Sequence, residues 1–78
     1  MDSRIKILTI LYRMEQLIYH ESTGTPEEFA QKLEISKRSL YNYLKILKDF
    51  GAEIRYNQHR RSYEYANQKR LLIKIGYK

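Results

Sequence analysis

The sequence predicts a small α+β domain, mostly α-helical, in which three helices are followed by a β-hairpin. Its 78 residues suit one domain, with 42% hydrophobic residues, 31% charged residues and no cysteine. Capping residues delimit two short helices between Thr25 and Gly51. A tyrosine-rich segment then alternates apolar and polar residues, as paired strands do. We therefore expect a single domain over residues 1–78.

The first helix is expected at about residues 3–20, where the apolar residues form a band more than twice as wide as the usual ~100° stripe. The centre of the band is Ile7, Leu11, Met14 and Ile18. It extends on one side to Ile5, Leu8, Tyr12 and Tyr19, and on the other to Ile10 and Leu17. One side can pack on the next two helices. The side with Ile5 needs another cover, either a second copy of the chain or the C-terminal segment of the same chain.

The second and third helices are predicted by their caps. Thr25 is a good N-cap, Pro26 suits the first helical position and Glu28 completes a capping box, so a helix is expected at about 26–33. Ser36 can cap the next helix, expected at about 37–50, and Gly51 can end it. A turn of about three residues is left between the two helices.

The outer face of the third helix is basic and polar. If Leu40, Leu44 and Leu47 face the core, another group lies on the arc about 100° to 200° away. That group is Arg38, Tyr41, Asn42 and Lys45. Arg38 suits guanine and Asn42 suits adenine, whereas the others suit phosphate. The backbone amides of residues 37–39 favour an anion. The alternative is an ordinary solvated helix face.

Charge is distributed unevenly along the chain. Residues 1–35 hold 4 Lys/Arg against 6 Asp/Glu, for −2, whereas residues 36–78 hold 11 against 3, for +8. The net charge of +6 therefore belongs to the half that follows the second helix. Such a concentration of positive charge indicates a protein that binds a polyanion.

The segment 53–66 predicts a β-hairpin with a basic tip. Tyr56, Tyr63 and Tyr65 are expected to pack against the helices, although exposed rings would suit base stacking. The expected tip consists of His59, Arg60 and Arg61, which are placed to meet a phosphate backbone or a minor groove. Residues 71–77 alternate again and predict a third strand.

The order of these elements resembles the winged helix-turn-helix domain that opens biotin-repressor-type, DeoR-type and WYL-domain bacterial regulators. Residues 25 to about 66 carry the likeness, centred on the motif ISKRSLYNYLKILKDFGAEIRYN. The sequence departs from the pattern at Asn42, where many relatives have Arg, and at Tyr43, where many have Asp. The hairpin also lacks the usual glycines, which leaves its turn type open. The resemblance implies the following DNA-facing positions: Lys37, Arg38, Ser39, Tyr41, Asn42 and Lys45.

We expect a cytoplasmic transcriptional regulator that binds double-stranded DNA, with the third helix in the major groove and the hairpin alongside. Homodimerisation is expected through the first helix, the C-terminal strand or both. Enzyme activity, cofactors and metals are not expected, because the chain lacks Cys, and His20 and His59 lie on separate elements. A membrane span is not expected either, since Arg4, Lys6 and Arg13 interrupt the first apolar segment.

Three other functions remain open at this point. The same fold can serve as a protein assembly module, with the apolar face of the first helix as its working surface. A second possibility is an accessory DNA-binding factor in phage or mobile-element biology. The third is RNA binding through exposed tyrosine rings.

Overall fold

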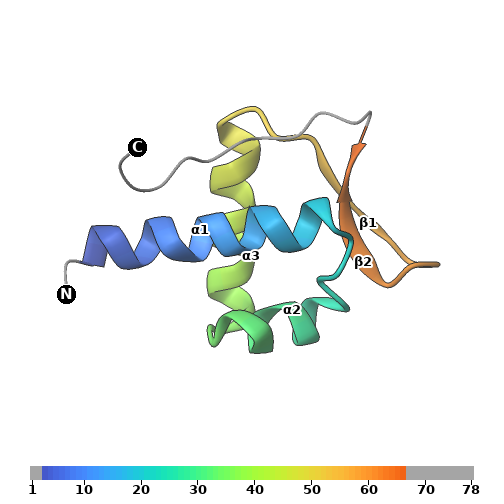
Figure 1. Ribbon diagram of the computed structural model, residues 1–78, viewed down its shortest axis with the longest axis horizontal. Coiled ribbons are helices and arrows are strands. Elements are labelled where there is room, and N and C mark those ends of the chain that lie inside the picture. Colours follow the sequence, from blue (N-terminus) through green and yellow to red (C-terminus); the bar gives the residue numbers. More distant parts are fainter. Residues whose placement is uncertain (1–2, 67–78) are drawn as a thin grey trace.

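In a computed structural model, the chain forms three helices followed by a two-stranded antiparallel hairpin (Figure 1). The structure describes residues 3–66, with side chains from Lys6 onward. The helices are α1 (Ser3–Tyr19), α2 (Pro26–Leu33) and α3 (Lys37–Asp49), and the strands are β1 (Ile54–Asn57) and β2 (Ser62–Tyr65). This order confirms the predicted fold class, with boundaries within a residue or two of those expected. The predicted strand at 71–77 lies outside the described residues.

Local capping chemistry sets the limits of α2. The Thr25 hydroxyl accepts a hydrogen bond from the Glu28 amide at 3.2 Å, and the Glu28 carboxylate accepts one from the Thr25 amide at 2.8 Å. This is the predicted capping box. The helix ends at Glu34, whose φ of 58° is left-handed and reverses the chain. Ser36 then caps α3, so α2 and α3 are joined by a three-residue turn, as predicted.

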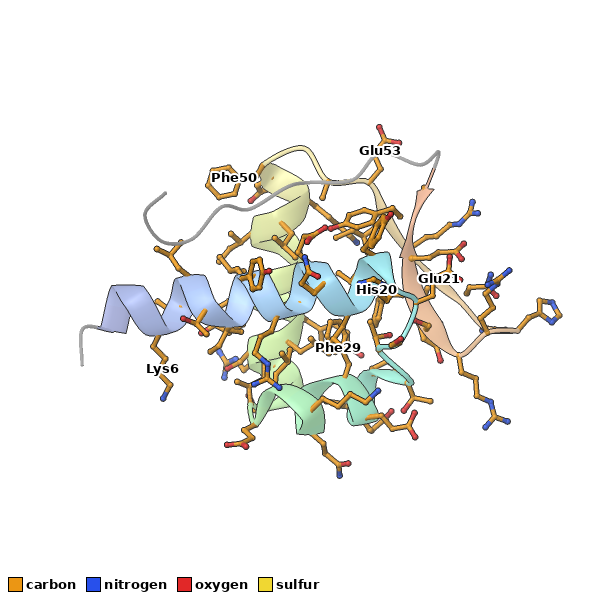
Figure 2. The ribbon with its side chains drawn as sticks, in the orientation of Figure 1. Lys6, His20, Glu21, Phe29, Phe50 and Glu53 are labelled. Atoms are coloured by element: carbon orange, nitrogen blue, oxygen red, sulfur yellow. The ribbon has the colours of Figure 1, made fainter. Side chains whose placement is uncertain are left out.

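The core lies where the three helices meet. Its most deeply buried apolar side chains come from all three: Met14, Ile18, Phe29, Leu40 and Leu47. Figure 2 shows Phe29 directed into the space between α1 and α2. Burying each of these side chains contributes about 1.5–3 kcal/mol to stability. The core therefore fixes α3 by its inner face and leaves the opposite face to solvent.

Two features of α1 differ from the sequence interpretation. Ile7, placed at the centre of the apolar band, is 39% exposed, because the N-terminal part of α1 extends beyond α2 and α3 (Figure 1). Glu15, which was assigned no role, is buried. Its carboxylate accepts hydrogen bonds from the Tyr65 hydroxyl at 3.2 Å and the Gln16 side-chain amide at 3.0 Å. These bonds compensate for the loss of water around a buried carboxylate.

The hairpin packs on the helices through its tyrosine rings. Tyr63 is buried, with its ring centroid 5.6 Å from that of Phe29 and 5.0 Å from that of Tyr56. Tyr56 and Tyr65 are partly buried against the same core. The prediction that these rings pack is confirmed. Because the RNA-binding hypothesis required exposed rings, this packing removes its main support.

A buried pair of hydroxyls joins the α1–α2 loop to β2. The Tyr63 amide donates a hydrogen bond to Thr23 Oγ1 at 2.8 Å, and the Thr23 amide donates one to Ser62 Oγ at 3.2 Å. The two hydroxyl oxygens lie 3.1 Å apart. Thr23 and Ser62 are both buried, although the sequence pattern gave neither a role. This network holds the hairpin at a fixed position relative to the helices.

Replacing Thr23 with valine keeps the shape of the side chain but removes the acceptor for the Tyr63 amide. A buried unpaired amide costs about 1–3 kcal/mol, so Thr23→Val should lower the free energy of unfolding by that amount. Urea denaturation measures it. Ser22→Ala, at the exposed neighbouring position, should stay within about 0.5 kcal/mol of wild type. Equal stability of Thr23→Val and wild type would contradict the anchoring role of this network.

Candidate DNA interface

The outer face of α3 exposes the side chains that the sequence pattern selected. Leu40, Leu44 and Leu47 are buried on the inner face. The selected residues on the opposite side are all exposed: Lys37, Arg38, Tyr41, Asn42 and Lys45. Within residues 3–66, no hydrogen bond or ion pair engages the side chains of Arg38, Asn42 or Lys45. These groups are available to a ligand.

Ser39 differs from the other selected positions. It is half-buried, and its amide donates a hydrogen bond to Ser36 Oγ at 3.1 Å. The hydroxyls of Ser36 and Ser39 also share a hydrogen bond of 3.2 Å. The cap therefore already uses one of the three amides that were expected to attract an anion. Lys37 and Arg38 supply the remaining two at the positive end of the helix dipole.

Lys37 is paired in the free protein. Its ammonium lies 3.1 Å from Oε2 of Glu27 in the first turn of α2. Hydrogen bonding to Glu27 raises the pKa of Lys37. The pKa of Glu27 is lowered, first by a hydrogen bond from its own backbone amide and then by Lys37. Both groups are charged at neutral pH, so the pair is an exposed salt bridge.

The hairpin tip is built without glycine. Asn57 Oδ1 accepts hydrogen bonds from the amides of His59 at 2.9 Å and Arg60 at 3.2 Å, which organises the turn. Arg61 then adopts a left-handed φ of 52°, the conformation that glycine most often supplies. Asn57 faces Ser62 across the base of the turn. The turn type that the sequence left open is thus set by an Asn side chain and a left-handed arginine.

The tip side chains are exposed, but they do not all have the same environment. His59, Arg60 and Arg61 all face solvent. The Arg60 guanidinium forms an ion pair with Glu21, in the turn after α1. Figure 2 shows Glu21 on the side of that turn nearest the hairpin. Sequence reasoning missed this pair because Glu21 and Arg60 are far apart along the chain.

A third ion pair lies across the two strands of the hairpin. Arg55 and Glu64 face each other in the register, with Arg55 Nε 2.7 Å from Glu64 Oε2. Asn57 Nδ2 donates a further hydrogen bond to Glu64 Oε1 at 3.3 Å. These two bonds, with that from Arg55 the larger cause, lower the pKa of Glu64. Arg55 therefore helps to hold the two strands together, although its side chain is 65% exposed.

Tyr63 of β2 is buried against Phe29 of α2. Burial raises the pKa of Tyr63 to about 12, with smaller contributions from Tyr41 on α3, Tyr56 on β1 and Glu27 on α2. The phenol therefore stays neutral over the physiological pH range. A neutral buried ring is well suited to hold β2 against the helices.

One further basic residue of α3 was missed. Lys48 is exposed and follows Lys45 by three residues, so it continues the same side of the helix toward its C-terminal end. The spacing of Tyr41, Lys45 and Lys48 by four and three residues is a signal that the sequence contained. A cation in the last turn also favours the helix dipole.

The predicted dimer residues lie on one side of α1. Leu8, Tyr12 and Tyr19 are between 40% and 49% exposed. The rings of Tyr19 and His20 make a T-shaped contact, with centroids 5.1 Å apart. The side chain of Ile5 lies outside the described side chains. No helix within residues 3–66 is long and apolar enough to cross a membrane, and no group of metal-ligating side chains gathers there.

Together, the two capped helices, their three-residue turn and the hairpin define a winged helix-turn-helix domain. The chain matches the model of a helix-turn-helix (HTH) domain family over residues 4–63. Because this match covers most of the chain, the protein belongs to that family, which occurs in biotin-repressor-type and DeoR-type regulators. Searches of curated proteins and of solved structures returned no match. Family membership implies DNA binding.

The Glu64 carboxylate should make stability depend on acid pH. Since its folded-state pKa lies below the ordinary value of 4.5, its contribution is present above that value and is lost as the pH falls through the lower folded pKa. Glu64→Gln should therefore flatten the decline in stability below about pH 5. Urea denaturation at pH 7, 5 and 3 measures this.

Arg55→Met supplies the matched variant, because it removes the main cause of the lowered pKa and leaves the carboxylate in place. Arg55→Met should likewise flatten the decline in stability below about pH 5. A full wild-type pH dependence in Glu64→Gln would contradict the assignment.

Proposed function

We propose that this protein is a transcriptional regulator that places α3 in the major groove of double-stranded DNA and the hairpin along the flanking backbone or minor groove. The observation that carries the proposal is the outer face of α3. It presents Arg38, Asn42 and Lys45 without internal partners among the described residues, while the opposite face is buried in the core. A helix held by one face and basic on the other fits a major groove.

The chemistry of each side chain supports a particular role. The Arg38 fork matches the O6 and N7 acceptors of guanine, and the Asn42 amide matches adenine. Lys45 and Tyr41 suit phosphates, as do Lys37 and the half-buried Ser39 at the start of the helix. On the hairpin, His59, Arg60 and Arg61 are exposed and suit the backbone or a minor groove.

The assembly-module hypothesis and the DNA-binding proposal predict different dependences of binding affinity on salt concentration. Binding through about six phosphate contacts should weaken roughly a thousandfold between 50 and 200 mM salt. An apolar interface would show no such decline. Selecting bound sequences from a random duplex pool would yield both the preferred site and any spacing between half-sites.

Arg38→Ala should weaken binding to the selected duplex by about 1–3 kcal/mol and relax base preference, because a base-edge contact is lost. Arg60→Ala should weaken selected and random duplexes alike, because a phosphate contact carries no sequence information. Fluorescence anisotropy with both duplexes measures this. Equal losses on the two duplexes for Arg38→Ala would exclude base reading by Arg38.

We also propose that a second copy of the chain covers the exposed side of α1. Leu8 and Tyr12 lie one helical turn apart there, and both are more than one-third exposed. An exposed apolar face on a DNA-binding domain suits two-fold pairing, because a two-fold dimer matches the symmetry of a palindromic site.

Leu8→Lys should lower the dimer fraction in sedimentation experiments at high micromolar concentration, because it places a charge in the proposed contact. Gln31→Lys adds the same charge to the exposed surface of α2 and should have no such effect. A wild-type chain that sediments as a monomer under these conditions would exclude self-pairing.

A further inference from the structure

Two cations of the proposed DNA surface are held by carboxylates in the free protein. Lys37 pairs with Glu27 at 3.1 Å, and Arg60 pairs with Glu21. The side chains of Lys37 and Arg60 are nevertheless 49% and 65% exposed. Each carboxylate therefore lies at the edge of the surface that would receive phosphate.

The two carboxylates belong to elements whose backbone is fixed. Glu21 has a left-handed φ of 54°, and the following amide, that of Ser22, donates a hydrogen bond to the Leu17 carbonyl at 2.9 Å. Glu27 lies in the first turn of α2, which the capping box holds in place. The carboxylates thus approach the basic surface from neighbouring elements, not from the hairpin tip or from α3.

The pairing involves two of the cations that suit phosphate. Within residues 3–66, carboxylates engage Lys37 and Arg60, whereas Lys45, which also suits phosphate, and Arg38, which suits a base edge, are unpaired. The paired carboxylates therefore act on phosphate contacts and leave the base-reading contact of Arg38 open.

We propose that Glu21 and Glu27 are affinity-setting residues, each of which holds a phosphate-binding cation in the unbound protein and is displaced from it by a DNA phosphate. This inference rests on the proposed function. Exposed ion pairs are weak, so a phosphate can displace the carboxylate readily. The released carboxylate stays close to the DNA, where it takes up a counterion in place of its former partner. Binding then releases fewer ions overall and is weaker than the number of basic residues suggests.

Displacement has a defined signature. Because Arg60 contacts phosphate, removal of Glu21 should strengthen binding to preferred and random duplexes by the same factor. It should also make affinity fall more steeply with salt, by up to about one unit of the log–log slope. A carboxylate that contacted a base would change the preferred sequence instead.

The experiment compares Glu21→Gln with Asp49→Asn on a random duplex and on a selected duplex, at 50, 100 and 200 mM salt. Asp49 is exposed at the C-terminal end of α3, so its replacement removes one negative charge away from both ion pairs. Circular dichroism melting checks that each variant is folded. We expect Glu21→Gln to bind about threefold to tenfold more tightly than wild type at 50 mM salt, and Asp49→Asn to show a smaller gain.

A second comparison separates displacement from simple repulsion between Glu21 and DNA. In an Arg60→Gln background, Glu21→Gln should give no more gain than Asp49→Asn, because the cation that it competed for is absent. The same cycle with Glu27→Gln and Lys37→Gln tests the other pair. For both pairs, the gain in affinity from replacing the carboxylate should disappear when the paired cation is also replaced.

Three results would overturn the inference. One is a wild-type affinity and salt slope in both Glu21→Gln and Glu27→Gln. Another is a gain that persists in the Arg60→Gln and Lys37→Gln backgrounds, which would indicate repulsion alone. The third is a wild-type protein that binds no duplex even at 50 mM salt, which would remove the proposed function as well and is therefore distinguishable from the first two.

Discussion

The hydrogen bonds between Thr23 and β2 fix the position of the hairpin relative to the three helices. The inner face of α3 is fixed by the core, and the hairpin adds Ile54 and its tyrosine rings to the same core. Its orientation depends on Tyr63, whose amide is bound by Thr23 and whose ring packs on Phe29. A residue in the loop between α1 and α2 thus sets the angle between the two candidate DNA-binding surfaces.

The parts of the fold that sequence predicted well are those set by neighbours in the chain. Thr25, Glu28 and Ser36 act within three residues of themselves, so the limits of α2 and α3 could be read directly. The outward face of α3 followed from helical periodicity in the same way. These interactions are short in sequence and chemically specific, which is why a single sequence is enough to predict them.

The parts that sequence did not predict depend on contacts between distant segments. Glu15 was not recognised as buried, because its partner Tyr65 lies fifty residues away. The ion pair of Glu21 with Arg60 was not predicted for the same reason, because 39 positions separate the two residues in the chain. The exposure of Ile7 depends on where α1 projects past its neighbours, and helical periodicity alone contains no information on that. For the candidate interface, exposure was therefore predicted more reliably than the internal partners of the basic residues.

The left-handed conformation of Arg61 shows how stability and charge oppose each other at one position. A left-handed backbone costs an arginine of the order of 1 kcal/mol, and glycine would adopt it without that strain. Glycine would also remove a positive charge from the tip of the hairpin. Libraries of variants selected for heat resistance should consequently enrich glycine at position 61, whereas libraries selected for retention on a polyanion should retain arginine there. Enrichment of glycine in the first selection and of arginine in the second would show that stability and positive charge make opposite demands at position 61.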